Sequence, residues 1–444
     1  MKTLERRGVL VGIAAFVLFT GLAGDAVRNS IGWYGFGAVV ALIAAASIAI
    51  LVTHRRGIRL GTLPWPLVAF LALATASIAW SFYPAASAIG VAAQLVTTLA
   101  ALALALVLSV PELTRALGIA LRAILGLSLL FELVVALIVR APVLPVWVSG
   151  ADRVDPPLLL YWSRNLLLEG DKIQGIVGSS SLLAMVALLA LIVFGVQLAA
   201  GTVRRGPGLA WLALAVLMVG LTRSATILLG IAAVLLVLGA ILAMRRAPDS
   251  RSRLLTGGVI AAVFAAAVTA ALVLRGPILD VLGKSETLTG RSEIWAAVIG
   301  LAQQRPAFGW GWISFWAPWV SPFDDLVTRN DVVQLHAHNA WLDIWLQLGI
   351  LGLVVFGALV VTTGIRSWLL ATDRVITAPG GSGPFSPLSL LAPLLLTALL
   401  VQSLAESRLL VEGGWMLLVI LATTTKLGML GRRVPATGAA VSRP

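Results

Sequence analysis

The chain has 444 residues, of which 59% are hydrophobic and only 11% are charged, and its mean hydropathy is +1.01. A soluble globular protein is about half apolar and about a quarter charged, so this composition excludes that class. The absence of cysteine excludes disulfide bonds, thiolate metal ligands and a cysteine nucleophile.

Apolar runs long enough to cross a bilayer, about 20 residues each, recur along the whole sequence. They predict an all-α polytopic membrane protein, with residues 1–444 forming a single integral membrane domain. The first run follows MKTLERR and has no convincing small-residue cleavage site, so we interpret it as a retained helix rather than a signal peptide. The twelve predicted spans are 8–24, 33–53, 63–80, 88–109, 115–140, 178–199, 207–221, 224–244, 254–275, 340–362, 386–404 and 409–427.

The charges predict that both termini are cytoplasmic. An even number of spans places the termini on one side, where 20 of the 32 lysines and arginines fall, whereas 15 of the 19 acidic residues fall on the other side. Residues 428–444 are then a cytoplasmic tail, and the two long outer segments are 141–177 and 276–339. The basic residues lie in short loops that anionic headgroups attract, so we expect membrane lipids as partners and no nucleic acid.

The predicted spans contain very few charges, with Arg122 and Glu132 as exceptions in the fifth. Charges inside a membrane usually mark ion paths or proton relays. Their scarcity argues against a coupled transporter and directs attention to the outer face of the membrane.

Arginine and lysine residues on the outer side form one candidate site. Arg164 and Lys172 precede the sixth span, Arg223 lies in the turn LTRSA between the seventh and eighth spans, and Arg291 precedes the tenth. Guanidinium groups bind phosphate oxygens in a bidentate manner. Each of these residues alone also fits a solvated or lipid-facing charge, but together they predict a site for a lipid-linked phosphate or diphosphate.

The second outer segment shows a helix followed by an aromatic loop. TGRSE at 289–293 predicts a helix start, and Arg305-Pro306 predicts its end. Gly309 and Gly311 indicate a tight, rigid loop. The aromatic residues of this loop are predicted to form an interfacial belt, with sugar stacking as the alternative; they are Trp310, Trp312, Phe315, Trp316 and Trp319.

The stretch HAHNAWLDIWLQLGILG, residues 336–352, contains two of the three histidines. Asn339 is expected to cap the tenth span and to place His338 at its N-terminus. Steps of four and three residues put His338, Gly349 and Gly352 on one stripe, where two glycines let a neighbouring helix approach closely. A helix N-terminus disfavours imidazolium, so we expect a largely neutral His338 that can act as a general base.

Two other interpretations of these histidines stay open. His336 and His338 can bind a metal together with Asp331, although two histidines on an irregular loop without a well-spaced third ligand indicate this weakly. We therefore expect no metal. His338 can also be an inert, hydrogen-bonded histidine beside the helix cap.

From about residue 70 onward the chain resembles the O-antigen ligase and polysaccharide polymerase superfamily of bacterial integral membrane glycosyltransferases. The superfamily has a pattern in its outer loop: His, then Asn, Ser or Gln, then nine residues, Gly, two residues and Gly. In this chain His338, Asn339, Gly349 and Gly352 match that pattern. Three further stretches are similar to other parts of the pattern: WSFYPAASAIGVAAQ (80–94), GRSEIW (290–295, with Gly290, Arg291 and Trp295) and RPAFGWGW (305–312).

The resemblance implies a GT-C-like, inverting transferase that needs no metal or other cofactor. It implies transfer of a glycan from an undecaprenyl-diphosphate donor to an acceptor hydroxyl, at the outer face of the cytoplasmic membrane. His338 is then the general base, and Arg291 binds the donor diphosphate. Arg223 lies two positions before the place of the family's second arginine, and Ser181 stands where the family often has Asn. Arg164 and Lys172 are candidates to compensate.

Ligases and repeat-unit polymerases share these motifs and differ in their acceptor, a lipid or a glycan; the sequence slightly favours a ligase. A lipid-linked sugar flippase or exporter is a different class, and it predicts a charged cavity at mid-membrane. A non-catalytic subunit of an envelope complex is the third alternative, for which the histidine and glycine pattern is packing alone.

Overall fold

The computed structural model describes residues 2–54, 60–150, 154, 156–273, 291–324, 326–329, 332–374, 376–378 and 381–433. These residues form a helical fold with two short antiparallel hairpins. The helices are α1 (Lys2–Leu22), α2 (Gly24–Thr53), α3 (Trp65–Ala76), α4 (Pro84–Val107), α5 (Val110–Val134), α7 (Ser180–Ala199), α8 (Arg205–Thr222), α9 (Ala225–Arg246), α10 (Ser250–Val273), α12 (Arg291–Gln303), α13 (Ala340–Thr372), α14 (Leu391–Ser403) and α15 (Glu412–Arg433). The hairpins pair β1 (Thr328–Arg329) with β2 (Val332–Val333) and β3 (Ile376–Ala378) with β4 (Gly381–Ser382). Single turns are η2 (Leu60–Thr62), η3 (Ser77–Trp80), η4 (Val135–Val139), η5 (Leu158–Leu160), η7 (Pro387–Leu390) and η8 (Ser407–Leu410).

The predicted all-α polytopic class is confirmed. Each of the twelve predicted spans coincides with a helix, and α12 is the additional helix expected after residue 289. Among the described residues, eight helices are long and apolar enough to cross a membrane, and three further apolar helices are shorter. The number of twelve crossings therefore stays a prediction.

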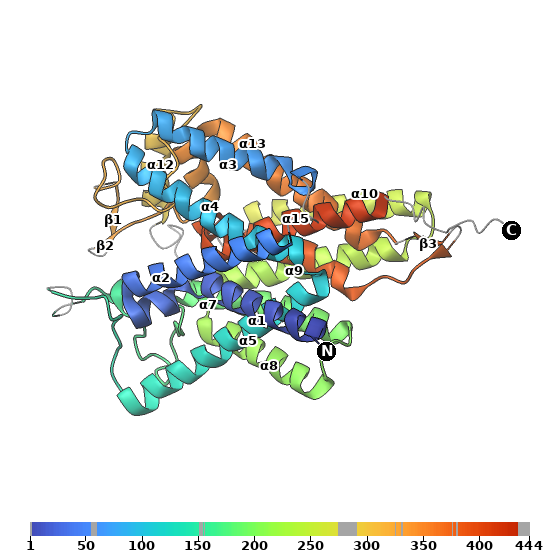
Figure 1. The fold of residues 1–444 in the computed structure, drawn as a ribbon, viewed down its shortest axis with the longest axis horizontal. Helices are drawn as coiled ribbons and strands as arrows, with labels where there is room; N and C mark the ends of the chain where they lie inside the picture. Colours follow the sequence, from blue (N-terminus) through green and yellow to red (C-terminus); the bar gives the residue numbers. More distant parts are fainter. Residues whose placement is uncertain are drawn as a thin grey trace.

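The two ends of the helical bundle differ in what they carry. In Figure 1 the first residues of α1 and the last residues of α15 lie towards the right, whereas α12 and the β1–β2 hairpin lie at the left. This arrangement is consistent with termini on one side of a membrane and the long segment before α13 on the other. We refer to the end with α12 as the predicted outer end.

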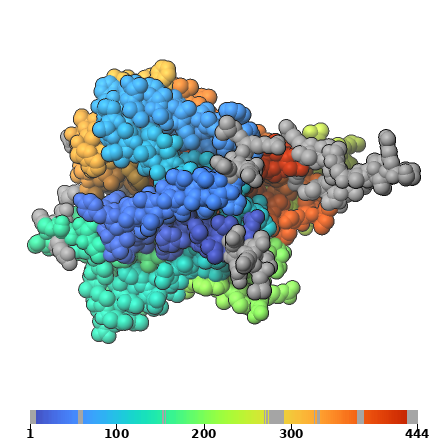
Figure 2. All heavy atoms as spheres, in the orientation of Figure 1, coloured from blue at the N-terminus to red at the C-terminus, as the bar shows by residue number. Residues whose placement is uncertain are grey.

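A second, smaller hydrophobic core lies at the predicted outer end. It joins α12, the loop that follows it and the start of α13, with Ile294, Val298, Trp316, Phe323 and Leu346 all at most 1% exposed. Tyr83, before α4, packs on Phe323 with ring centroids 5.1 Å apart. Figure 2 shows the orange residues of this region against the light-blue residues of α3 and α4. The described residues 291–324 are thus fixed on the bundle.

The predicted aromatic belt is wrong for two of its members. Trp312 and Trp316 are 0% and 1% exposed. Trp312 packs edge-on against Phe70 in the main core, at 5.3 Å between centroids. Trp319 is 76% exposed and fits the belt prediction. A loop that folds back over the helices offers large side chains a protein interior, so an aromatic residue close to a membrane surface need not face lipid.

The sequence predicts that Gly349 and Gly352 let a neighbouring helix approach α13 closely. This prediction is wrong about which element approaches. Helix α13 is broken at Gly349, which has φ +67° and ψ −165°. The loop after α12 enters this break: Trp310 N and Gly311 N donate to the carbonyls of Leu346 and Gln347 at 3.0 and 2.9 Å, and Ile350 N donates to Pro306 O at 2.8 Å.

The closely approaching element is therefore a loop rather than a helix. A Cβ at Gly349 would overlap the carbonyl group of Ala307, and a Cβ at Gly309 would overlap the backbone of Gln347. At Gly352 the nearest atoms belong to the side chains of Leu348 and Ile344 in α13 itself. The expectation of a tight loop at Gly309 and Gly311 is confirmed.

Candidate active site

His338 lies where the loop turns into α13, as predicted. Asn339 is the N-cap, and its side-chain oxygen accepts from Trp341 N at 3.0 Å and Leu342 N at 3.3 Å. This satisfies two of the N–H groups that a helix start leaves unpaired. His338 itself has φ +49°, a left-handed conformation that is uncommon for a residue with a side chain. Such strain persists where the surroundings fix it, and it occurs often at functional sites.

A buried carboxylate fixes the backbone around His338. Asp343, 1% exposed, accepts from Ala337 N at 3.0 Å and from Trp316 Nε1 at 2.9 Å. Ser407 Oγ also donates to it. Asp343 thereby joins the first turn of α13, the aromatic loop and the turn between α14 and α15.

Glu406 connects the two functional side chains that the sequence predicts. Its Oε2 lies 3.0 Å from His338 Nδ1, and its Oε1 accepts from Arg291 Nη2 at 2.9 Å. The three side chains are 13%, 25% and 18% exposed for Glu406, His338 and Arg291. The structure therefore brings His338 and Arg291 to one carboxylate, in a partly covered site.

The charge on Glu406 is stabilised despite its burial. Burial alone raises a carboxyl pKa, but the hydrogen bond with His338, followed by the electrostatic effects of His338, His336 and Arg291, lowers the pKa of Glu406 to about 2. A carboxylate accepts hydrogen bonds and cannot donate, so Nδ1 of His338 carries the proton of this contact. The other ring nitrogen, Nε2, lies 3.3 Å from Gln334 Oε1. Gln334 Oε1 is an acceptor, so this contact is a hydrogen bond only while Nε2 carries a proton; an unprotonated Nε2 is the nitrogen that can take a proton from a substrate.

His336 supports His338 from the other side. Its Nδ1 accepts from His338 N at 3.1 Å, and the two imidazole centroids are 4.1 Å apart. Burial and the neighbouring His338 lower the pKa of His336 well below the ordinary value of a histidine. A neutral imidazole is what an accepting Nδ1 requires. His336 therefore supports the backbone of His338 through this hydrogen bond.

This burial makes one pH dependence testable. Unfolded His336 takes up a proton below about pH 6.5 whereas the folded residue stays neutral, so folding stability falls as the pH falls, by at most about 1.4 kcal/mol per pH unit from this group. We expect the melting temperature of purified wild type to fall more between pH 7.5 and 5.5 than that of His336→Asn, which keeps an acceptor near Nδ1. Equal pH dependence of the two proteins would contradict the neutral state of His336.

Helix α12 presents Arg291 from its first turn. Trp295, one turn later, donates from Nε1 to Ala337 O at 3.0 Å, which ties α12 to the residue before His338. The supporting role of Trp295 stays a prediction that this hydrogen bond favours. Gly290, another predicted supporting residue, lies outside the described residues, as does Asp331.

Three other predicted phosphate ligands make different contacts. Arg223 ends α8 in a left-handed conformation, with φ +45°, beside Gly170. Ile173, next to Lys172, donates from its N–H to Leu221 O at 3.3 Å, and Arg164 N donates to Gln174 Oε1 at 2.9 Å. Within the described part of the chain, no hydrogen bond or ion pair joins Arg164, Lys172 or Arg223 to His338, Arg291 or Glu406. Their role in binding a diphosphate stays a prediction.

The charged residue Glu132 has a structural explanation. It is 1% exposed and accepts from Ser163 Oγ at 3.0 Å, Gln174 N at 3.0 Å and Gly175 N at 2.7 Å. Three donors replace the water that burial removes. Glu132 thereby holds the first outer segment on the end of α5.

The alternative that these side chains bind a metal ion can be compared with the observed geometry. The ligand atoms of His336, His338 and Glu406 all lie within 4.8 Å of one another. In the structure, however, both Nδ1 atoms are used in hydrogen bonds, and Arg291 brings a positive charge to Glu406. A cation has to displace these contacts and lie close to a guanidinium. The trio therefore fits a hydrogen-bonded acid–base site better than a metal site.

Fold and site together define a multi-pass membrane protein with an acid–base cluster at one end of its helical bundle. Residues 208–357 match the family described as O-antigen ligase. Over 164 residues the chain is 33% identical to the exopolysaccharide production protein ExoQ of Rhizobium meliloti (strain 1021), a match that covers 34% of this chain and 37% of ExoQ. The aligned part is thus little more than a third of that relative's length.

These two matches support the O-antigen ligase-like superfamily, so the resemblance seen in the sequence is confirmed. The chain is a multi-pass membrane protein that is similar to the O-antigen ligase family over residues 208–357. The matched residues 208–357 include Arg291 and His338. Glu406 lies beyond them, and sequence reasoning did not identify it.

Proposed function

We propose that this protein is an inverting glycosyltransferase. It moves a glycan from an undecaprenyl-diphosphate donor to an acceptor hydroxyl at the outer face of the cytoplasmic membrane. One observation carries the proposal: Glu406 contacts both His338 and Arg291, at 3.0 and 2.9 Å, so that a base and a phosphate-binding group share one site.

The reaction needs few groups, because a diphosphate is a good leaving group. Nε2 of His338 takes the proton of the acceptor hydroxyl as the oxygen attacks the anomeric carbon. The bond from that carbon to the diphosphate oxygen breaks, and undecaprenyl diphosphate leaves with the electron pair. Attack opposite the leaving group inverts the anomeric centre. Glu406 orients the imidazole and stabilises the imidazolium that forms, in the way that a carboxylate supports histidine in other acid–base sites.

Arg291 stabilises the negative charge that develops on the leaving diphosphate. A guanidinium can bind two phosphate oxygens at once, and in a partly covered site this contact is stronger than in water. Arg291 is held at the start of α12 by Glu406, so it needs little rearrangement to reach a ligand beside His338.

Repeat-unit polymerisation is the second candidate. The relative ExoQ is named for exopolysaccharide production, which favours an acceptor that is itself a glycan. The same base and arginine serve either acceptor, so the site geometry does not separate ligase from polymerase.

The test is mass spectrometry of lipid-linked glycans from cells that lack this protein. Full-length chains that accumulate on the carrier indicate a ligase, and single repeat units that accumulate indicate a polymerase. Complementation with wild type should restore the normal carrier pool, and complementation with His338→Ala should not. An unchanged carrier pool in the deletion strain would overturn the transferase proposal in favour of a non-catalytic subunit.

A further inference from the structure

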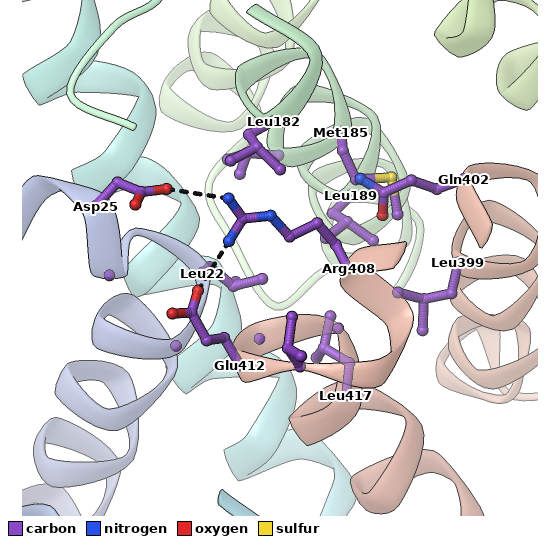
Figure 3. A pocket seen from close by; sticks show the side chains of 16 residues that line it. Leu22, Asp25, Leu182, Met185, Leu189, Leu399, Gln402, Arg408, Glu412 and Leu417 are labelled. Carbon is purple, nitrogen blue, oxygen red and sulfur yellow. Dashed lines mark hydrogen bonds and ion pairs between the residues drawn. The ribbon is translucent and has the colours of Figure 1, made fainter. Parts of the chain in front are cut away.

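A cluster of four charges lies directly beside the candidate site. Arg408 Nη1 contacts Glu412 Oε2 at 3.0 Å, and its Nη2 contacts Asp25 Oδ2 at 3.4 Å. Arg28 binds the same two acids, with 2.5 Å to each. Figure 3 shows Arg408 between Asp25 and Glu412, next to a cavity of about 40 Å³ that Gln402 also lines.

The two arginines of this cluster are held differently. Arg28 has a side chain only 8% exposed, and it also lies over the rings of Trp33 and Phe36, at 5.2 and 4.7 Å. A buried charge needs such full pairing. Arg408 is 22% exposed and makes the longer contacts. Arg28 therefore already provides the internal partner of both carboxylates.

Arg408 has donors left for a ligand. A guanidinium has five N–H donors, and the contacts with Asp25 and Glu412 use two of them. Among the described residues no acceptor is bonded to the other three. The two carboxylates thus fix the position of Arg408, while the remaining N–H groups of its guanidinium stay available for an anion.

Arg408 is separated from the histidine pair by the ring of Phe315. It follows Glu406 by two residues, and its guanidinium carbon lies 5.6 Å from the ring of Phe315. That ring is 5.8 Å from His336, whose own ring lies 4.1 Å from His338. Arg408 is also one of the charges that disfavour protonation of His336, although burial is the larger cause of its lowered pKa. Arg291 and Arg408 therefore border the same group of side chains.

We propose that Arg408 is the second guanidinium of the donor site and binds the diphosphate together with Arg291. The inference rests on the proposed function. It assigns to a residue between α14 and α15 the role that the sequence predicted for Arg223, which ends α8. Arg28 keeps Asp25 and Glu412 neutralised while Arg408 contacts phosphate oxygens. Two arginines allow each phosphate of a diphosphate to have its own cationic partner.

The test is equilibrium binding to the full-length protein in phosphatidylcholine nanodiscs, followed by tryptophan fluorescence. The probes are undecaprenyl diphosphate and undecaprenyl monophosphate. We expect wild type to prefer the diphosphate and Arg408→Gln to lose about tenfold in diphosphate affinity, with less than threefold change for the monophosphate. Arg408→Lys keeps the positive charge but not the planar guanidinium with its several donors, so its affinity for the diphosphate should fall by an intermediate amount.

Two control variants separate binding from folding. Arg305→Gln removes another arginine of the predicted outer end, one that lies over Phe82 at 3.8 Å, and should bind both probes like wild type. Asp25→Asn weakens the internal hold on Arg408 without removing it and should bind the diphosphate at least as tightly as wild type. If Arg408→Gln does not fold, Arg408→Lys and Asp25→Asn carry the test.

The outcomes distinguish the two proposals. Wild type that binds undecaprenyl diphosphate with preference, together with Arg408→Gln or Arg408→Lys of unchanged affinity, overturns the role of Arg408 and leaves the proposed function intact. Wild type that does not bind undecaprenyl diphosphate overturns the proposed function and the inference with it.

Discussion

His338→Ala is expected to reduce glycan transfer about 10³-fold while the protein still inserts and folds. General bases contribute about 10² to 10⁴ to such reactions, and here the remaining groups cannot take the proton from the acceptor hydroxyl. The side chain of His338 is 25% exposed and fills no core position, so its loss should cost little stability. The measurement is transfer by purified protein from a lipid-linked donor, with melting temperature as the check on folding.

Glu406→Gln tests the pair of His338 and Glu406 by changing the carboxylate instead of the imidazole. The amide keeps the size of the side chain but cannot act as the anionic partner of Nδ1, so we expect transfer to fall about 10²-fold. In the His338→Ala background, Glu406→Gln should cost little more, because residues that act as one unit are not additive. Full additivity of the two losses would show that Glu406 acts through Arg291 rather than through His338.

His336→Ala is the matched control for the base. This variant removes the second imidazole, which supports the backbone of His338 but does not contact Glu406 among the described hydrogen bonds. It should keep most of the transfer activity. Full activity of His338→Ala, or equal losses in both variants, would refute the assignment of the base.

The fold was predictable because a bilayer imposes strong rules on a sequence. A helix must satisfy its own backbone groups in lipid, so long apolar runs such as 88–109 and 178–199 predict helices with few alternatives. The cap at Asn339 was predictable for a related reason, since local hydrogen bonding decides it. Gly349 shows the limit. Its position in an apolar run is that of a helix interior, and only the loop at Ala307 explains the break.

The candidate site was predictable in part. His338 and Arg291 stand in recognisable local patterns, and the structure joins them through Glu406. Glu406 itself follows His338 by 68 residues and lies in a short turn between two apolar runs, where a lone acid resembles any solvated charge. Asp343 stands inside an apolar stretch, and its partners come from two other segments. Contacts between distant segments depend on tertiary packing, and neither local sequence patterns nor the number of charges predicts that packing. The signal that was present is the density of charge in SLAESRLLVEGG, a turn with Glu406, Arg408 and Glu412.

Gly349→Ala is expected to destabilise the protein by about 4 kcal/mol or more, or to prevent its accumulation in the membrane. The residue has φ +67°, which costs a residue with a Cβ about 1 kcal/mol or more. The added Cβ also meets the carbonyl group of Ala307, which is backbone and cannot rotate away. To relieve the overlap, the loop has to leave the break in α13, and the hydrogen bonds from Trp310, Gly311 and Ile350 are lost with it.

The matched control is Gly357→Ala in the same helix. Gly357 has no atom within 4 Å of an added Cβ, so alanine there should be neutral or stabilise the helix by about 0.5 to 1 kcal/mol. Melting temperature in detergent and yield in membranes measure both variants. The same loop carries Trp316 to Asp343, which holds Ala337 beside His338, so any Gly349→Ala protein that does fold should also lose transfer. A Gly349→Ala protein as stable and as active as Gly357→Ala would mean that the loop does not enter the helix, and that the position of His338 depends on Asn339 and Glu406 alone.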